Sequence, residues 1–599
     1  MFGFRQSAVA VSIVTLSSAA QAQTPVSAPV TDIAYSVRFD RETAEAGTLH
    51  VDMHFQTSGN DAVLLSLPAW TPGAYQISNF ARNVLDFTVR GENRNLRWDK
   101  ADYDTWRIHP DGIQSLTVSF DYRADSLDNA MAWAQSDFVM FNGTNVFLYP
   151  EGHDLAFAST ITFTTEPDWL VASGFTSNGQ GGFTAADYHE LVDMPVFIGS
   201  IDVDSAEVDG IWNRLATYPA QAMQGPGRDL LWEQIHQMMP PMHDVFGETP
   251  WDTYTTLLIF TEETPGGSAL EHSNSHVGIY NPGFIGNPLL ASITAHEIFH
   301  AWNVKRLRPA EMVPYDYSRT QETTLLWMSE GITDYYADIA LVRGQIIPPQ
   351  SFYQLTAAKI DEVESTRAVA LEDASLNTWI DPVDGTAYVY YPKGSLAGLL
   401  LDILIRDASN NLASLDDVMR ALYESTYQAG TGFTTAQFWE AVEFVALGLD
   451  VEKFHERYID GRDPFPYQRT FALAGWRLLV DSATVPAFGM GMTSDSAGVK
   501  IVEVTPESLA DDAGVEEDDY LLQIGGIEVN DPSFAQQFQV RFGNAPSGTA
   551  LDITVLRNQE TLTLPGVLRY EEIVSYRLQE DPTASAKARR IRQGILTGR

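Results

Sequence analysis

Two histidines stand four positions apart in the stretch AHEIFHAWNVKR, and Glu297 directly follows the first of them, His296. On a helix, positions i and i+4 lie one turn apart on the same face, so His296 and His300 can bind one metal ion. Glu297 beside them could take a proton from a water molecule on that ion. The alternative is a packed helix whose histidines are satisfied in the core. The motif alone does not decide between the two.

The flanking residues favour a helix over this motif. Asn287 suits the N-cap, and Pro288 suits the first helical position, where an N–H group would have no partner in the helix. We therefore expect a helix that begins near Pro288 and presents both histidines. Apolar side chains for its burial are supplied by Leu289, Leu290, Ile293, Ile298 and Phe299.

A catalytic zinc ion needs three protein ligands and an open fourth position. The chain has no cysteine, so the third ligand must be a histidine or a carboxylate. Glu330 stands 30 residues after His300 in the apolar run LLWMSEGITDYYADIALVRG, where a carboxylate needs a partner. Asp334, one helical turn later, could accept a hydrogen bond from the other ring nitrogen of a ligand histidine. Gly331 should let this second helix approach the first closely, and Gly344 should end it.

The length and composition indicate a multidomain globular protein. A chain of 599 residues predicts three or four units, and an apolar content of 44% excludes wholesale disorder. Short alternating apolar runs over 23–204 predict an N-terminal antiparallel β domain, a sandwich or a saddle. A helical period over 205–470, with a strand at 255–261, predicts the catalytic domain. Strands around one helix over 480–570 predict a third domain, so the fold class is multidomain α+β.

The termini and the charge bound the location and the partners. Residues 1–22 carry one charge, a short apolar run and an Ala-Gln-Ala cleavage pattern, which predicts a signal peptide and export to a bacterial periplasm or medium. Without them the net charge is −43, from 36 basic and 79 acidic residues, which argues against nucleic acid as a partner. No later segment is long and apolar enough to span a membrane, so no stable membrane insertion is expected. The chain ends in a basic tail at 571–599, and the part of it after Pro582 is expected to be disordered and solvated.

A loop inside the β domain has an unusual composition, LPAWTPGAYQISNFARNV, from Leu67 to Val84. Its prolines and glycine force a turn that carries Trp70 and Tyr75. Aromatic side chains beside a rigid turn are more often structural plugs than ligand contacts, so we favour the structural role.

Several of these stretches together resemble the M61 family, the glycyl aminopeptidases. HEIFHAWNVKRLRP followed by WMSEG is similar to the gluzincin metallopeptidases, and GGSALEHS with LPAWTPGAYQISNFARNV narrows the resemblance to M61. That family pairs an N-terminal β domain with a thermolysin-like zinc peptidase domain and a C-terminal PDZ domain. The resemblance implies a PDZ carboxylate-binding loop formed by Phe488, Gly489, Met490 and Gly491.

The resemblance also implies roles for residues around the metal site. The GGSALEHS loop stands where the related M1 aminopeptidases have a GAMEN strand, so Glu271 aligns with the glutamate that binds the substrate's α-ammonium. Tyr391 of YPKG is similar to the tyrosine that donates to the tetrahedral oxyanion, and the adjacent Tyr390 could be confused with it. The remaining substrate-binding residues of the loop are Gly266, Gly267 and Ala269.

These assignments make a zinc aminopeptidase the main hypothesis. His296, His300 and Glu330 hold Zn²⁺, and Glu297 passes the proton of the attacking water to the leaving amine. The resemblance implies peptide substrates with a small N-terminal residue, Gly or Ala.

Two other functions stay open. One is an exported zinc endopeptidase that cleaves internal bonds, with the PDZ domain docking its substrates. The other is a non-catalytic protein that binds peptides through the PDZ domain and holds a structural metal ion. The PDZ domain itself either binds a C-terminal peptide or only caps the catalytic unit.

Overall fold

The computed structural model describes residues 26–446, 448–495 and 497–598. The predicted signal peptide at 1–22 lies outside these residues. The chain divides into two compact units. The first takes its described residues from Met1–Phe352, Thr366–Phe465 and Arg589–Arg599, and the second from Tyr353–Ser365 and Pro466–Ala588. Within the described ranges, no helix combines the length and apolarity needed to cross a membrane.

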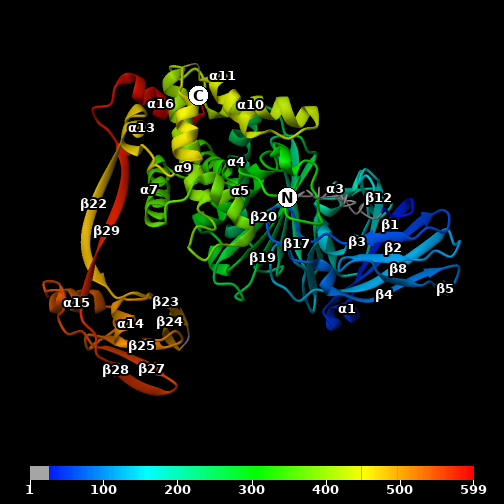
Figure 1. Ribbon diagram of the computed structural model, residues 1–599, viewed down its shortest axis with the longest axis horizontal. Helices are drawn as coiled ribbons and strands as arrows, with labels where there is room; N and C mark the ends of the chain where they lie inside the picture. The colour runs from blue at the N-terminus through cyan, green and yellow to red at the C-terminus, as the bar shows by residue number, and fades with distance from the viewer. Residues whose placement is uncertain (1–25, 447, 496, 599) are drawn as a thin grey trace, which may run out of the picture. The chain divides into compact units, whose positions relative to one another are not determined.

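An eight-stranded sheet forms the N-terminal part of the first unit, in the order β14-β15-β12-β1-β2-β8-β4-β5 (Figure 1). Its strands alternate buried and exposed side chains, which is the period that the sequence shows. The pairing is antiparallel as predicted, except that β1 and β12 run parallel. The strands are β1 Val30–Phe39, β2 Thr48–Thr57, β4 Val84–Gly91, β5 Arg94–Asn95, β8 Ser115–Arg123, β12 Ser159–Thr165, β14 Thr176–Ser177 and β15 Phe183–Ala185.

Two four-stranded sheets accompany it, in the orders β13-β16-β10-β9 and β11-β3-β7-β6. Every residue of β10 and β16 is buried, because the first of these sheets packs on the sheet that follows in the chain. Short helices α1 Arg41–Ala46, α2 Gly143–Val146 and α3 Tyr188–Val192 connect the strands. The strands are β3 Val63–Ser66, β6 Trp98–Lys100, β7 Thr105–Ile108, β9 Trp133–Gln135, β10 Phe138–Asn142, β11 Tyr149–Pro150, β13 Leu170–Ser173 and β16 Pro195–Gly199.

A five-stranded sheet, β17-β18-β19-β21-β20, begins the peptidase-like part of the first unit. The predicted strand at 255–261 is β19, which pairs in parallel with both neighbours. The GGSALEHS stretch, expected as a loop, instead contributes the antiparallel edge strand β20. The strands are β17 Asp202–Val208, β18 Ile211–Tyr218, β19 Thr253–Phe260, β20 Gly267–Glu271 and β21 Ser275–Tyr280.

Helices follow this sheet, and α5 packs on both β20 and β21 (Figure 1). A π-helical turn, η4, runs directly into α6, which ends at Gly344 as predicted. The helices of this part are α4 Pro226–Phe246, which stands before β19, and then α5 Pro288–His300, η4 Trp327–Gly331, α6 Ile332–Arg343, α8 Leu371–Asn377, α9 Tyr390–Ala408, α10 Leu415–Thr426, α11 Thr435–Val445 and α12 Val451–Phe454. Most of α7 Pro349–Ser365 belongs to the second unit.

The second unit has its own core and its own sheet, β23-β24-β25-β27-β28, with β26 paired to β25. A long ribbon of β22 and β29 precedes and follows this sheet in the chain. The predicted helix near Ser508 is α14, and the Gly-Gly turn joins β25 to β26 as expected. The elements are α13 Tyr467–Leu473, β22 Trp476–Ala487, β23 Met490–Asp495, β24 Gly498–Val504, α14 Leu509–Ala513, β25 Tyr520–Ile524, β26 Ile527–Glu528, α15 Phe534–Phe542, β27 Ile553–Arg557, β28 Glu560–Leu564 and β29 Arg569–Glu580.

The expectation of disorder after Pro582 is wrong, because Ala586–Thr597 forms helix α16. The first residues of the tail at 571–599 complete β29. Ala588, Ile591 and Ile595 recur at the helical spacing of three and four, and all three are buried. Basic residues stand between these positions. The prediction of disorder rested on their charge and did not take the apolar face of the helix into account.

Candidate active site

Helix α5 begins as the sequence predicted and carries both histidines in its last two turns. The side chain of Asn287 accepts a hydrogen bond from the backbone N–H of Leu289 at 2.9 Å, and Pro288 is the first helical residue. Most of the helix is buried, including Glu297 and His300. The cap and the buried face therefore fix the direction in which the two imidazoles point.

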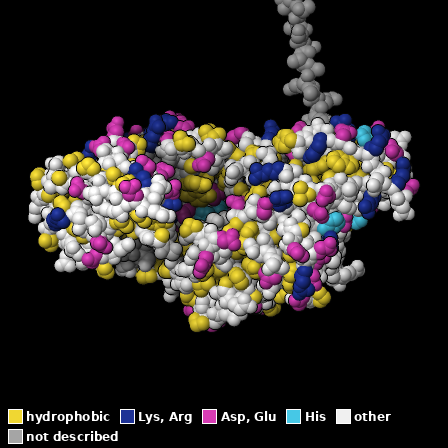
Figure 2. Space-filling model, turned by 90° about the horizontal axis from the view of Figure 1, so that it is seen from below, with side chains coloured by type: hydrophobic (Ala, Val, Ile, Leu, Met, Phe, Trp, Pro, Cys, Tyr) yellow, Lys and Arg dark blue, Asp and Glu magenta, His cyan; other side chains and the backbone are white. Residues whose placement is uncertain are grey.

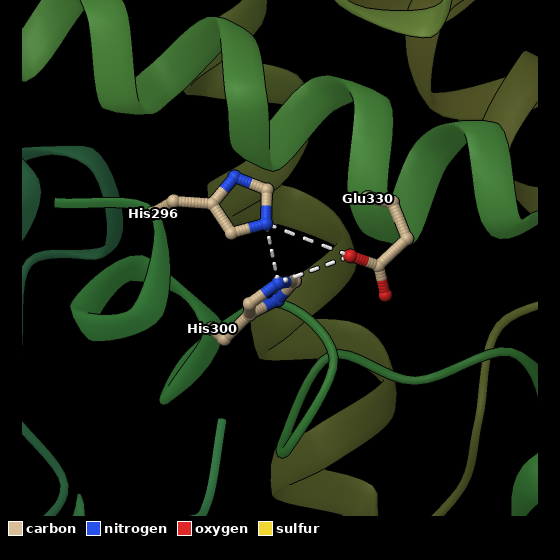
Figure 3. A group of neighbouring side chains, drawn as sticks. All are labelled: His296, His300 and Glu330. Carbon is tan, nitrogen blue, oxygen red and sulfur yellow. Dashed lines mark hydrogen bonds and ion pairs between the residues drawn. The ribbon is translucent and has the colours of Figure 1, made fainter. Parts of the chain in front are cut away.

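The two histidines and Glu330 converge on one point (Figure 3). The Nε2 atoms of His296 and His300 are 2.9 Å apart. The Oε2 atom of Glu330, on η4, lies 3.1 Å from Nε2 of His300 and 3.6 Å from Nε2 of His296. The ligand atoms all lie within 4.8 Å of one another. Two imidazole nitrogens and one carboxylate oxygen, without sulfur, are the donor set of an open catalytic zinc site.

Hydrogen bonds behind the ligands hold the rings in place. Nδ1 of His300 donates to the backbone carbonyl of Asn303 at 2.7 Å, so its Nε2 is left with a lone pair for a metal ion. The Asn303 amide also donates to the carbonyl of Met328 at 3.0 Å, on the turn that carries Glu330. Asp334, predicted behind a ligand histidine, has Oδ1 3.9 Å from Nδ1 of His296. Asn303 thus ties the two ligand-bearing segments together.

Arg306 connects the end of α5 to the edge of the sheet. Its guanidinium donates to the carbonyl of Ala301 at 2.6 Å and to the carbonyl of Ser273 at 2.7 Å. The same guanidinium lies 5.2 Å from the ring centroid of Trp251. A cation at the C-terminal end of a helix is stabilised by the unpaired carbonyl groups there. Arg306 therefore fixes α5 against the turn that follows β20.

Glu297 is buried beside the ligand atoms. Burial raises its pKa well above the usual range of a carboxyl group. Its Oε2 has no hydrogen-bond partner among the described residues. A buried carboxylate with an unused oxygen next to a metal site is suited to hold and transfer a proton.

Tyr391 and Tyr390 have different surroundings in the first turn of α9. The ring centroid of Tyr391 is 6.0 Å from that of His296, whereas the hydroxyl of Tyr390 is hydrogen-bonded to that of Thr378 at 3.0 Å. Of these two tyrosines, Tyr391 is therefore the one whose ring lies beside that of His296.

The segment of η4 and α6 does approach α5 closely, as expected, because α6 packs on α5 and Glu330 of η4 lies 3.1 Å from His300. Gly331 itself instead admits α9, since a Cβ atom added to it would lie 2.5 Å from Cα of Gly394. The same contact brings the first turn of α9, with Tyr391, against the turn that carries Glu330.

Glu271 ends the edge strand β20 in a buried cluster of charges. Only 4% of its surface is exposed, and Oε1 finds no hydrogen-bond partner in the described part of the chain. The Nζ atom of Lys305 is 2.7 Å from Oδ1 of Asp193 but 4.0 Å from Oε1 of Glu271. Burial raises the pKa of Glu271 to about 7, although Lys305 acts in the opposite direction.

The other residues assigned to substrate binding lie along the same strand. Gly267 and Ala269 pair with Tyr280 and Gly278 of β21, and the carbonyl of Gly266 accepts a hydrogen bond from Asn281. The strand is the last in its sheet, so within the described ranges one side of its backbone has no neighbouring strand. Such an edge can add an extended peptide as a further strand.

Tyr75 reaches the metal ligands from the β domain, which the sequence interpretation did not favour. Its hydroxyl donates to Oε1 of Glu330 at 2.6 Å. Trp70 of the same loop does have the structural role expected, because its Nε1 donates to the carbonyl of Asp316 and its ring packs on Trp379. No spacing in the sequence relates Tyr75 to Glu330, which stands 255 positions away.

The stretch assigned as a PDZ carboxylate loop lies in the second unit, where it links the end of β22 to the start of β23 and includes the first two residues of β23. Gly489 has a φ of 68°, a left-handed conformation that favours glycine. The carbonyl of Gly489 accepts a hydrogen bond from the backbone of Thr505 at 2.9 Å, and Phe488 packs edge-on against Phe538 of α15. Met490 and Gly491 begin β23 and pair with β24.

Family models match two parts of the chain. The Peptidase M61 N-terminal domain matches residues 34–200, and the M61 glycyl aminopeptidase matches residues 290–397, which include the histidines and Glu330. No curated protein matches the chain significantly.

Many solved structures are similar to this chain. An aminopeptidase N family protein from Idiomarina loihiensis has 21% identity and a TM-score of 0.81, covering 94% of this chain and 100% of its own. An M1 zinc metallopeptidase from Deinococcus radiodurans has 14% identity and a TM-score of 0.48, covering 74% of this chain and 96% of its own. The first similarity shows that nearly the whole chain has a known fold.

Proposed function

We propose that this chain, which belongs to the M61 peptidase family, is a zinc aminopeptidase that removes single residues from the N-terminus of peptides. The observation that carries the proposal is the group of His296, His300 and Glu330 with the buried Glu297 beside it. Glu271 adds a buried carboxylate with an unpartnered oxygen among the described residues, which suits the ammonium group of a free N-terminus.

A zinc ion on the three ligands would polarise the scissile carbonyl and lower the pKa of water. Glu297 accepts a proton from the attacking water and delivers it to the nitrogen of the leaving amine. The hydroxyl of Tyr391 donates a hydrogen bond to the carbonyl oxygen as negative charge develops there. Glu271 binds the ammonium group and so sets which peptide bond reaches the ligands.

We expect a preference for small N-terminal residues, Gly or Ala. Support comes from the M61 glycyl aminopeptidase model that matches the metal-binding part of the chain. We also propose export to the periplasm or the medium, on the pattern of residues 1–22, and a PDZ-type peptide-binding role for the second unit. The support for that role is the FGMG stretch at the start of β23 and the aromatic contact with α15.

Metal analysis combined with matched peptides tests the main proposal. The purified protein should contain about one zinc ion per chain, as an open three-ligand site requires, and should lose hydrolysis with a chelator and regain it with zinc. A free dipeptide amide should be cleaved and its N-acetylated form should not. Equal cleavage of the two would instead support an endopeptidase. Full activity without metal would overturn the metal mechanism itself.

A further inference from the structure

The two oxygens of Glu330 have different partners in the structure. Oε2 faces the Nε2 atoms of both histidines, whereas Oε1 accepts the hydrogen bond from Tyr75 (Figure 3 shows the first of these arrangements). Tyr75 is only 5% exposed, and its bond to Glu330 is 2.6 Å long. A short bond to an ionised carboxylate is among the stronger hydrogen bonds in proteins. Glu330 is therefore held from behind by a residue of the β domain.

The backbone that carries Tyr75 is held in an unusual conformation. Tyr75 has a φ of 47°, in the left-handed region that residues other than glycine rarely adopt. Such a conformation persists only where the surroundings enforce it, and it is frequent at functional sites. Here the backbone N–H of Ala69 donates to the carbonyl of Tyr317 at 2.7 Å, and the hydroxyls of Thr71 and Thr144 are 2.6 Å apart. These hydrogen bonds attach the loop to the segment that carries Tyr317 and to helix α2, which carries Thr144.

The same loop also touches the second acidic group of the site. Gly73 has a φ of 105°, and a Cβ atom added to it would lie 2.5 Å from both carboxylate oxygens of Glu271. Any side chain at this position would therefore displace the buried carboxylate of Glu271. Gly73 and Tyr75 bring one loop into contact with Glu271 and Glu330 at once.

We propose that the loop from Trp70 to Tyr75 is a positioning element of the active site. Tyr75 fixes one oxygen of Glu330 so that the other is presented to the metal ion, and Gly73 leaves the space in which the Glu271 carboxylate sits. This inference rests on the proposed zinc aminopeptidase function. It assigns the β domain a direct part in the site, through a positioning residue for the metal and another for the substrate amine.

Tyr75→Phe tests the first half, because it keeps the ring and removes only the hydroxyl. Zinc affinity, measured by competition with a chromogenic chelator, should fall about 10- to 100-fold, the usual effect of losing a partner behind a metal ligand. The absorption spectrum of the cobalt-substituted protein should also shift, which a purely structural role would not cause. The matched control is Tyr188→Phe, which removes a buried hydroxyl of the same β domain that donates to the carbonyl of Phe147.

The control should keep the affinity and the spectrum of the unmodified protein, even if its thermal midpoint falls. Tyr75→Phe with unchanged zinc affinity and unchanged cobalt spectrum would overturn the role of Tyr75. Both readouts concern metal binding, so they are separate from hydrolysis. If zinc affinity depends on Tyr75 but the protein never cleaves peptides, the proposed function is rejected and the role of Tyr75 stands.

Gly73→Ala tests the second half. The displaced Glu271 carboxylate should raise KM for peptides with a free N-terminus by about 10-fold or more, while zinc affinity stays unchanged. An unchanged KM in a variant that unfolds at the normal temperature would overturn the role of Gly73. If Gly73→Ala does not fold, Glu271→Asp provides the second measurement, since it withdraws the carboxylate from Gly73 and should raise KM in the same way. An unchanged KM there would also count against this role.

Discussion

Two clusters of charged side chains lie close together in the first unit and differ in how they are assembled. The histidine cluster consists of His296, His300 and Glu330, which come from α5 and the turn η4. The acid cluster consists of Asp193, Glu271 and Lys305, which come from three separate segments. Helical spacing produces most of the first cluster, whereas tertiary folding alone produces the second.

The clusters also differ in how their charge is balanced. In the histidine cluster, the carboxylate of Glu330 faces two imidazoles and a tyrosine hydroxyl. In the acid cluster, the ammonium group of Lys305 is the counter-charge of two carboxylates, and it lies nearer to Asp193 than to Glu271. In the proposed reaction, the histidine cluster would hold a metal cation, and Glu271 of the acid cluster would bind the ammonium group of the substrate. One face of the molecule shows hydrophobic side chains beside a hollow in which histidine is visible (Figure 2).

The largest effect is expected from Glu297→Gln. This variant tests proton transfer by Glu297 separately from metal binding by the histidine cluster. Glutamine keeps the shape of the side chain but cannot accept the proton, so kcat should fall by about 100- to 10,000-fold. The zinc content should stay at the level of the unmodified protein, because Glu297 is not a ligand. Turnover and metal content are measured on the same preparation. A zinc-loaded variant with normal turnover would show that Glu297 is not the base.

The acid cluster is tested by Lys305→Met, which removes its only ammonium group. The side chain of Lys305 is fully buried and that of Asp193 is 15% exposed, so two carboxylates would be left without a counter-charge. Breaking a buried ion pair costs about 3–5 kcal/mol of stability, measured here by urea denaturation. Arg457→Met, in an exposed pair with Asp463, is the control and should have a far smaller effect. Equal losses of stability in the two variants would mean that Lys305 does not stabilise the protein by balancing the charge of Asp193 and Glu271.

The sequence predicted the histidine cluster because its members obey local rules. The i, i+4 spacing of His296 and His300 and a carboxylate in an apolar run both follow from short-range patterns. The sequence did not predict a role for Asp193, because nothing near it in the chain indicates that it lies beside Lys305, which follows the end of α5. Tyr75 was interpreted as structural for the same reason. Its partner depends on how the β domain packs against the helices.

The local periodicity of apolar residues also determined which strands and turns could be predicted from the sequence. The alternation in β2 and the turn residues between β25 and β26 gave strands and a turn that the structure confirms. The glycine and small residues of the GGSALEHS stretch predict a loop. The stretch is a strand because its backbone pairs with β21, and pairing between strands is a tertiary property that composition does not reveal.

Tyr391→Phe sharpens the comparison by testing a residue that belongs to neither cluster. Removing one donor to a developing oxyanion usually lowers kcat by about 100- to 1,000-fold, and KM and zinc content should change little. Tyr390→Phe is the matched control, because its hydroxyl is hydrogen-bonded to Thr378. If the Tyr390 variant loses turnover and the Tyr391 variant does not, the two roles are reversed.

The smallest effect is expected from Glu271→Gln, and it appears as a change in pH dependence. Burial raises the pKa of Glu271 from 4.5 to about 7. The folded protein therefore binds a proton that the unfolded chain releases, so this group makes stability fall as pH rises from about 4.5 to about 7.

Glu271→Gln should remove this slope and be more stable than the unmodified protein by about 3 kcal/mol above pH 7, from urea titrations at several pH values. Its KM for free-amine peptides should rise, because glutamine cannot pair with an ammonium ion. A variant with the original slope would show that Glu271 does not titrate in this range. A variant with a flat slope and an unchanged KM would show instead that the acid cluster is a structural feature, and that the substrate's amine is bound by another group.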